Sequence, residues 1–141
     1  MHEKREVVFR GEGFTYTAWF YRCTETGIDF TTTELDDRNI GQVYEQYRKK
    51  YGIPTVEEIK ATRKKYGISA AMMSKILGLG INQYRLYENG EIPSQSIGKL
   101  LGCIADVTVF KSFLNASKRQ IGPKKYKLIL ENIESELQIP A

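Results

Sequence analysis

The spacing of apolar and polar residues changes once along the chain, near residue 33. Before that point apolar and polar residues alternate with a period of two, and β-branched and aromatic residues are frequent, which is typical of strands. We predict a three-stranded meander with strands over 7–10, 14–23 and 28–32 and a hairpin loop at Gly11-Glu12-Gly13. After residue 33 the period becomes 3.6, which predicts helices.

Helix start and stop signals divide the remainder into a linking helix and a helical domain. An apolar face predicts a first helix that stops at Gly52-Ile53-Pro54; it contains Ile40, Val43, Tyr44, Tyr47 and Tyr51. Six further helices are predicted, with starts near Thr55, Ser69, Asn82, Ser94, Asp106 and Pro123. We therefore expect a mainly α fold with a small N-terminal antiparallel β module over 1–33, a linking helix over 34–54 and a helical domain over 55–141.

The charge distribution favours an anionic partner for the helical domain. The chain of 141 residues has a formal net charge of +4. Residues 55–105 carry seven bases and four acids, whereas residues 1–33 carry four bases and five acids, and a basic surface attracts anions such as nucleic acid. There is no run of about 18 apolar residues and no secretory leader pattern at the start. We expect a cytoplasmic, unanchored protein.

Few residues in this sequence support catalysis or metal binding. The chain has one histidine, His2, and two cysteines 80 positions apart, neither in a C-x-x-C pair. We therefore expect no enzyme, no metal site and no cofactor. Cys23 and Cys103 are interpreted as reduced, small, buried hydrophobic residues in preference to a redox or metal role.

The segment from Ala70 to Tyr87 predicts a helix-turn-helix. Two short helices that cross steeply need apolar contacts, a small residue where they approach and a glycine in the turn. Ser74 supplies the small residue and Gly78 the glycine. The apolar contacts are assigned to Met73, Leu77, Leu79, Tyr84 and Tyr87.

The predicted second helix has the side chains that read bases in a DNA major groove. Asn, Gln and Arg match the edges of adenine and guanine, and a Leu can contact a thymine methyl group. The candidate base-reading residues are Asn82, Gln83, Arg85 and Leu86. Candidate phosphate contacts are Arg63, Lys64, Ser69, Lys75, Tyr84, Asn89, Ser94 and Lys99. The alternative is a helix pair used only for packing or for protein binding.

Three segments, 59–69, 77–84 and 87–94, resemble the lambda-repressor-like (XRE, Cro-type) helix-turn-helix family. The Gly-x-Gly-Ile-Asn segment at 78–82, the Tyr-Glu-x-Gly ending at 87–90 and the preceding β module are similar to the MqsA (YgiT) type of antitoxin. The resemblance implies a helical domain that forms a homodimer on a palindromic double-stranded DNA operator. It also implies a small zinc-binding β domain that binds a protein toxin. The expected function is a sequence-specific transcription regulator, an antitoxin or autorepressor of a toxin–antitoxin operon; the alternative is a protein-binding module with vestigial DNA binding.

The chain departs from this family at three kinds of position. The family's zinc domain uses two cysteine pairs, whereas here Thr26 stands where the partner of Cys23 would be, so we expect no zinc. Leu86 occupies the family's arginine position, beside Arg85, and Ala70 replaces the glutamine at the start of the preceding helix. The operator sequence is therefore not inferred from relatives.

Three features have more than one interpretation. The aromatic residues Tyr16, Trp19 and Tyr21 suit a core or a protein contact better than stacking on unpaired bases, because their segment is slightly acidic. The bases at 118–119 and 124–127 suit a solvated face better than phosphate contacts. The apolar stripe of the last helix packs either on its own domain or on a second copy.

Overall fold

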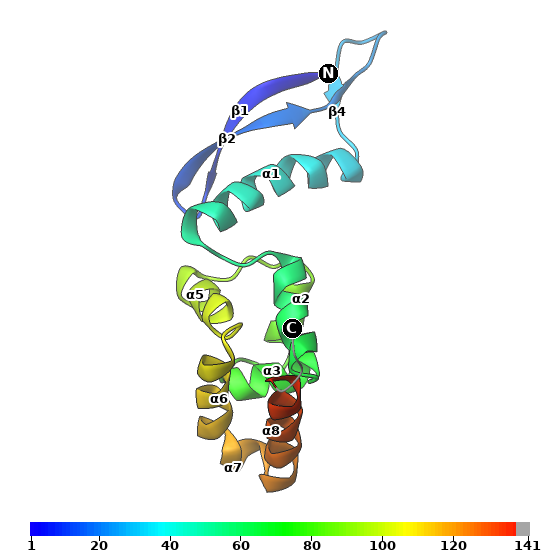
Figure 1. Cartoon of the computed structure of the whole chain (residues 1–141). Helices are drawn as coiled ribbons and strands as arrows, with labels where there is room; N and C mark the ends of the chain where they lie inside the picture. The colour runs from blue at the N-terminus through cyan, green and yellow to red at the C-terminus, as the bar shows by residue number, and fades with distance from the viewer. Residues whose placement is uncertain (138–141) are drawn as a thin grey trace. The chain divides into compact units, whose positions relative to one another are not determined.

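The computed structural model describes residues 1–137, which belong to two compact units. The first unit, Met1–Tyr51, contains β1 (His2–Phe9), β2 (Glu12–Trp19), β3 (Tyr21–Arg22), β4 (Asp29–Phe30) and α1 (Thr33–Tyr51) (Figure 1). The helical unit begins at Gly52 and contains α2 (Val56–Lys65), α3 (Ala70–Leu77), α4 (Gln83–Glu88), α5 (Gln95–Cys103), α6 (Val107–Ala116), α7 (Lys118–Ile121) and α8 (Pro123–Leu137). The expected mainly helical fold with a small N-terminal antiparallel sheet is confirmed.

The N-terminal hairpin turns through two residues, Arg10 and Gly11. Both have positive φ, 53° and 80°, as a two-residue turn matched to the twist of antiparallel strands requires. Phe9 therefore pairs directly with Glu12. The loop predicted at Gly11-Glu12-Gly13 is shorter than expected, because Arg10 adopts the left-handed conformation that the sequence suggested only for glycine.

Helix α1 packs on the hairpin and completes the first unit. Val43 and Tyr47 of α1 are buried together with Phe14 and Ala18 of β2, and the Tyr47 ring meets the Phe9 ring edge-on at 5.1 Å. Acidic residues in the first turn and basic residues in the last turn suit the helix dipole. The segment predicted as a linking helix is thus part of the first compact unit.

The predicted three-stranded meander is instead two separate two-stranded sheets, β1–β2 and β3–β4. β2 ends at Trp19, and Phe20 closes the β1–β2 ladder by exchanging two 3.0 Å hydrogen bonds with Met1. The predicted third strand pairs only with the end of the predicted second strand, Tyr21 with Phe30 and Arg22 with Asp29. It does not extend along β2, where side-chain amides of α1 bond to the edge. The sequence pattern carried no sign of this competition.

The helices of the second unit begin where the capping residues predicted. Thr55, Ser69 and Ser94 each accept a hydrogen bond from a backbone N–H in the first turn of α2, α3 and α5. Asp106 does the same for α6. The unpredicted α7 is a single turn directly after α6, too short to show a period.

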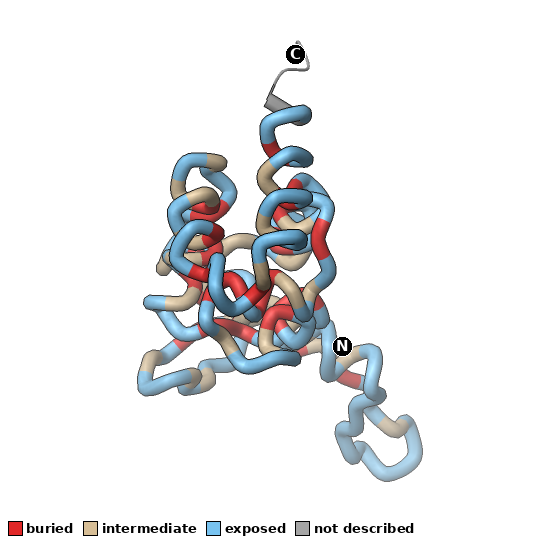
Figure 2. The backbone as a smooth tube through the Cα atoms, turned by 90° about the horizontal axis from the view of Figure 1, so that it is seen from below, coloured by how far each residue is buried: buried red, intermediate tan, exposed pale blue. Residues whose placement is uncertain are grey.

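The apolar faces of these helices meet in one hydrophobic core. Figure 2 colours the backbone by the burial of each residue, and the buried residues lie on the inner sides of the helices whereas the exposed residues lie on their outer sides. Tyr66 stacks on Phe110 with ring centroids 3.8 Å apart, and its hydroxyl donates to the Ile104 carbonyl at 2.6 Å. Burial raises the pKa of Tyr66 to about 12. Ser117, buried between α6 and α7, donates to the Ile76 carbonyl of α3 at 2.8 Å. This hydrogen bond joins α3 to the α6–α7 connection.

Candidate nucleic-acid interface

Helices α3 and α4 follow one another through residues 78–82. Ser69 begins α3 by accepting a 3.1 Å hydrogen bond from the Met72 N–H. Gly78 ends it with φ of 74°, a left-handed conformation that glycine adopts without steric cost. The Leu79 N–H then donates to the Ser74 carbonyl at 2.8 Å. These local bonds set the direction in which the chain enters α4.

The inner face of α4 is anchored in the core. Ser74 is fully buried, and its hydroxyl oxygen accepts a 3.0 Å hydrogen bond from the Tyr84 N–H at the start of α4. The Tyr84 hydroxyl donates to the Ile59 carbonyl of α2 at 2.6 Å, and burial raises the pKa of Tyr84 strongly. Tyr87 is also buried. The rotation of α4 about its axis is therefore fixed by α2 and α3.

Because the inner face is fixed, three of the four predicted base-reading residues point to solvent. Asn82 and Arg85 are exposed, and Leu86 is 43% exposed. Gln83 is half-buried and donates from Nε2 to Glu91 Oε2 at 2.7 Å. The fold thus brings Asn82, Arg85 and Leu86 together on one outer surface and holds Gln83 at its border.

The predicted phosphate contact at Tyr84 is wrong. Its ring is completely buried and its hydroxyl is bonded to Ile59, so no phosphate can reach it. The ring packs in the helix–helix contact as the sequence predicts, and only the expected reach of its hydroxyl to a phosphate fails, because that hydroxyl bonds inside the core.

Arg63 is engaged in an ion pair inside the helical unit. Its Nε lies 2.8 Å from Glu88 Oε1, and its Nη1 donates to the Ile68 carbonyl at 3.2 Å. The side chain of Glu88 is only 7% exposed, and a carboxylate buried to this extent needs a partner. The structure thus gives Arg63 the role of holding α4 against α2, in place of the predicted free phosphate contact.

The remaining predicted phosphate contacts lie on the surface; they are Lys64, Ser69, Lys75, Asn89, Ser94 and Lys99. The hydroxyls of Ser69 and Ser94 accept backbone hydrogen bonds as helix caps, so each is already committed to its own helix. Between residues 52 and 137 the described ion pairs are limited to Arg63–Glu88. Within residues 52–137, the exposed Lys64, Lys75 and Lys99 therefore make no ion pair with an acidic side chain.

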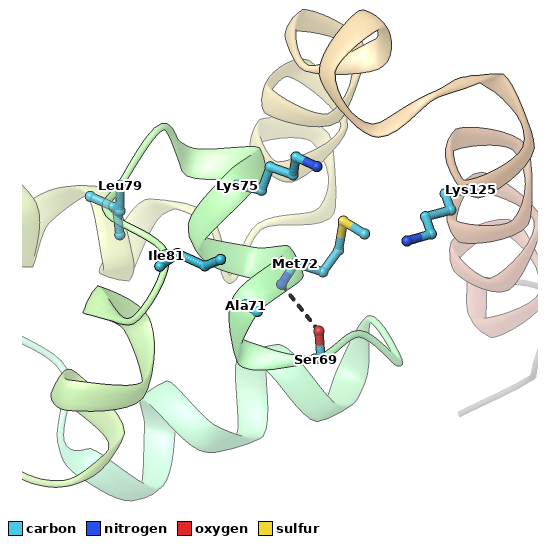
Figure 3. A pocket seen from close by; sticks show the side chains of 7 residues that line it. All are labelled: Ser69, Ala71, Met72, Lys75, Leu79, Ile81 and Lys125. Atoms are coloured by element: carbon cyan, nitrogen blue, oxygen red, sulfur yellow. Dashed lines mark hydrogen bonds between the residues drawn. The ribbon is translucent and has the colours of Figure 1, made fainter.

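A groove between α3 and the start of α8 adds a lysine that the sequence interpretation left on a solvated face. The groove has a volume of about 350 Å³ and is lined mainly by apolar side chains. Figure 3 shows Lys125 reaching across from α8 toward Met72, with Lys75 on the α3 side of the groove. Ile81, 73% exposed, lines the groove directly before Asn82. Only the folding of α8 onto α3 brings Lys125 near the predicted interface; its position in the sequence gave no sign of this.

The cysteines do not follow the sequence expectation. Cys103 is exposed at the end of α5, and Cys23 is half-buried in the turn between β3 and β4. A hydrogen bond from Thr26 lowers the pKa of the Cys23 thiol. Among residues 1–137 no group of three or more His, Cys, Asp or Glu side chains is placed to hold a metal ion.

Comparisons with known proteins add no family assignment: no family model, no curated protein and no solved structure matches this chain. Within the described residues, no helix combines the length and the apolar character that a membrane crossing requires.

Proposed function

We propose that this chain is a sequence-specific double-stranded DNA-binding regulator of transcription that acts as a homodimer on a palindromic operator in the cytoplasm. The observation that carries the proposal is the arrangement of α4. Its inner face is held by Tyr84 and Tyr87, while Asn82, Arg85 and Leu86 share its exposed face. This is the geometry with which a short helix presents amide and guanidinium groups to base edges in a major groove.

Exposed lysines on the helices of the second unit support duplex DNA as the ligand. Lys64, Lys75 and Lys99 are exposed, and Lys125 faces α3 across the groove. We assign these lysines to phosphates, which position the protein without reading sequence. Tyr84 and Arg63 are not included, because the core already uses both.

The biological setting that we propose is an antitoxin or autorepressor of a toxin–antitoxin operon. It rests on the resemblance of residues 59–94 to repressor-type helix-turn-helix domains and of the β module to MqsA-type antitoxins. In this setting the first unit binds a protein toxin. The proposal includes no catalytic step and no cofactor.

Binding to duplex DNA is tested by selecting ligands from random duplexes with the pure protein and measuring affinity at several salt concentrations. We expect the logarithm of the affinity to fall by about 0.9 per phosphate contact for each unit in the logarithm of the salt concentration. A nearly flat salt response would exclude duplex DNA as the ligand.

Arg85→Ala separates base reading from general attraction to phosphate. We expect it to weaken binding by about 1–3 kcal/mol and to relax the preference at one base pair, because a guanidinium contacts guanine through two hydrogen bonds. Arg85→Lys keeps the charge but loses this fork, so the base preference should relax in it as well. Lys49→Ala removes one exposed charge from the first unit and serves as the matched control. Unchanged affinity and base preference in both Arg85 variants would remove this residue from the interface.

A second candidate function is a protein-binding module, and one observation favours it. Tyr21, Ile28 and Phe30, at the β3–β4 sheet, are each at least half exposed. Exposed apolar residues gathered in one place suit a protein contact. A footprint of the protein on its own promoter separates the two functions, since a protein-binding module with vestigial DNA contact protects no defined site.

A further inference from the structure

The two outer edges of the N-terminal hairpin are treated differently by the fold. Each strand of a two-stranded sheet presents one row of outward N–H and C=O groups, which can pair with another strand. On β2 this row is already bonded to α1, whereas on β1 it faces solvent. Figure 1 shows α1 running beside β2, with β1 on the far side of the sheet.

Three side-chain amides of α1 close the edge of β2. Asn39 accepts from the Trp19 N–H at 2.8 Å and donates to the Trp19 carbonyl at 3.0 Å. Gln42 makes the same pair of bonds with Thr17, at 3.0 and 2.7 Å. Gln46 donates to the Thr15 carbonyl at 2.8 Å. An amide carries a donor and an acceptor as a peptide group does, so these side chains replace a neighbouring strand.

The register of the hairpin defines which groups of β1 remain open. Phe9 and Glu12 flank the two-residue turn and pair directly, so the odd residues of β1 direct their backbone groups toward β2. The even residues, His2, Lys4, Glu6 and Val8, direct theirs outward. All four are exposed, Val8 by 71%. Within residues 1–137 no hydrogen bond to these outward groups is present.

We propose that β1 pairs antiparallel with β1 of a second copy of this chain, which joins two hairpins into a four-stranded sheet. A two-fold axis at Arg5 gives a register in which Lys4 of each copy lies opposite Glu6 of the other, and His2 opposite Val8. Each copy then supplies the outward groups that the other copy needs, and oppositely charged cross-strand pairs stabilise a sheet. Two Arg5 residues meet at the axis, each bound to Glu3 of its own strand at 2.6 Å.

The charges of β1 argue for a second copy rather than a foreign strand. Charged residues on an edge normally prevent pairing with other chains. The segment Glu3-Lys4-Arg5-Glu6 has no net charge, and in this register Lys4 and Glu6 form two oppositely charged pairs, one on each side of the Arg5 residues at the axis. The charges that disfavour pairing with an unrelated strand therefore favour pairing with β1 of a second copy. A difference of this kind between partners gives an interface its specificity.

The closed edge of β2 limits the assembly to two copies. In the four-stranded sheet both outermost strands are β2, and both are covered by α1 amides. A sheet whose ends are covered cannot add further strands. The result is a closed dimer rather than a fibre. The inference places the contact of the proposed homodimer on β1 of the first unit, not on the helical domain as the family resemblance implies, and it does not depend on DNA binding.

The experiment is sedimentation equilibrium of the full chain without DNA, with Lys4→Pro and Lys4→Thr as a matched pair. We expect a wild-type mass of twice the 16.2 kDa chain. Proline removes the outward N–H of residue 4 and leaves the β1–β2 ladder intact, so dimerisation should weaken by about tenfold or more. Threonine keeps the N–H, and its dimer should stay close to wild type. Trp19 fluorescence checks that the hairpin of each variant is folded.

A charge-reversal pair tests the register. Glu6→Lys places Lys4 opposite a lysine twice in each dimer and should weaken dimerisation by about tenfold. Adding Lys4→Glu to the same chain restores opposite charges and should recover most of the loss. This rescue uses no proline variant, so it tests the register of the β1 contact even where Lys4→Pro perturbs the hairpin.

Two results would overturn the inference. One is a wild-type chain that stays monomeric at a protein concentration of about 100 μM. The other is a dimer that withstands both Lys4→Pro and Glu6→Lys, which would place the contact elsewhere. A monomer that still binds duplex DNA contradicts the β1 dimer and the homodimer of the proposed function but not DNA binding itself, whereas a β1 dimer that binds no duplex contradicts DNA binding and leaves the β1 contact standing.

Discussion

The helical unit and the first unit are stabilised in different ways. The helical unit has a core of fifteen buried apolar residues contributed by helices and their connections. The first unit buries five apolar residues, Phe14, Ala18, Phe20, Val43 and Tyr47, and adds five side-chain hydrogen bonds from α1 to the backbone of β2. A hairpin is marginal in water without such support, so α1 does for β2 what further strands do in a larger sheet.

Because the two units are stabilised differently, they leave different polar groups exposed to a binding partner. In the helical unit the core fixes α4 from inside, and the polar outer face of α4 has no structural task. In the first unit the polar side chains of α1 are used for stability, and the backbone of β1 is left open. One unit thus offers side chains to a partner, and the other offers a strand edge.

The largest effect is expected from Phe110→Ala. Phe110 is fully buried and stacks on Tyr66, and deleting a buried aromatic ring costs about 3–5 kcal/mol of unfolding free energy. Urea unfolding followed by far-UV circular dichroism measures the helical signal, and the fluorescence of Trp19, the only tryptophan of the chain, follows the first unit. We expect the helical signal to shift much more than the fluorescence. Equal shifts would show that the two units unfold as one and would contradict the comparison.

An intermediate effect is expected when the internal ion pair of the helical unit is broken. Arg63→Ala leaves Glu88 buried without its partner, which should lower the unfolding free energy by about 1–3 kcal/mol. Lys64→Ala removes the same charge from an exposed neighbour and should change stability by less than about 0.5 kcal/mol. The measurement is urea unfolding by circular dichroism at neutral pH. Similar losses in both variants would mean that the Arg63–Glu88 contact adds nothing beyond one surface charge.

The smallest effect is expected from the amides of α1. Gln42→Ala removes both hydrogen bonds to Thr17 and exposes that edge to water, so we expect a loss of about 1 kcal/mol in the first unit, read from Trp19 fluorescence. Gln46→Ala, which removes one bond, should cost about half as much. If Gln42→Ala leaves the unfolding free energy of the first unit unchanged, the packing of Val43 and Tyr47 alone holds α1 on the sheet.

Local signals predicted the helical unit well. Thr55, Ser69, Ser94 and Asp106 mark helix starts because capping involves only the next three residues, and Gly78 marks a helix end because its conformation is local. The exposure of Asn82, Arg85 and Leu86 followed from the period of the neighbouring apolar residues. These features depend on residues close together in the sequence, so a pattern records them.

Long-range competition could not be predicted in this way. The third strand was expected along β2, but Asn39 and Gln42, 20 and 25 positions from their partners, bond to that edge. Phosphate contacts were predicted for the Tyr84 hydroxyl and for Arg63, but both groups bond within the helical unit to partners 25 positions away in the sequence. Lys125 is exposed, as predicted for a solvated face, but its position across a groove from α3 depends on the tertiary fold.

The amino-acid sequence determined the periods, the caps and the turn glycines, and with them the helices, the hairpin and the polar face of α4. Tertiary structure alone decided which polar groups form hydrogen bonds inside the molecule and which remain exposed for a partner. The backbone groups on the edge of β2 belong to the first kind, and those on the edge of β1 belong to the second. The reason is that a hydrogen-bond donor or acceptor can be satisfied by several competing partners, and only the packed chain determines which of them comes within reach.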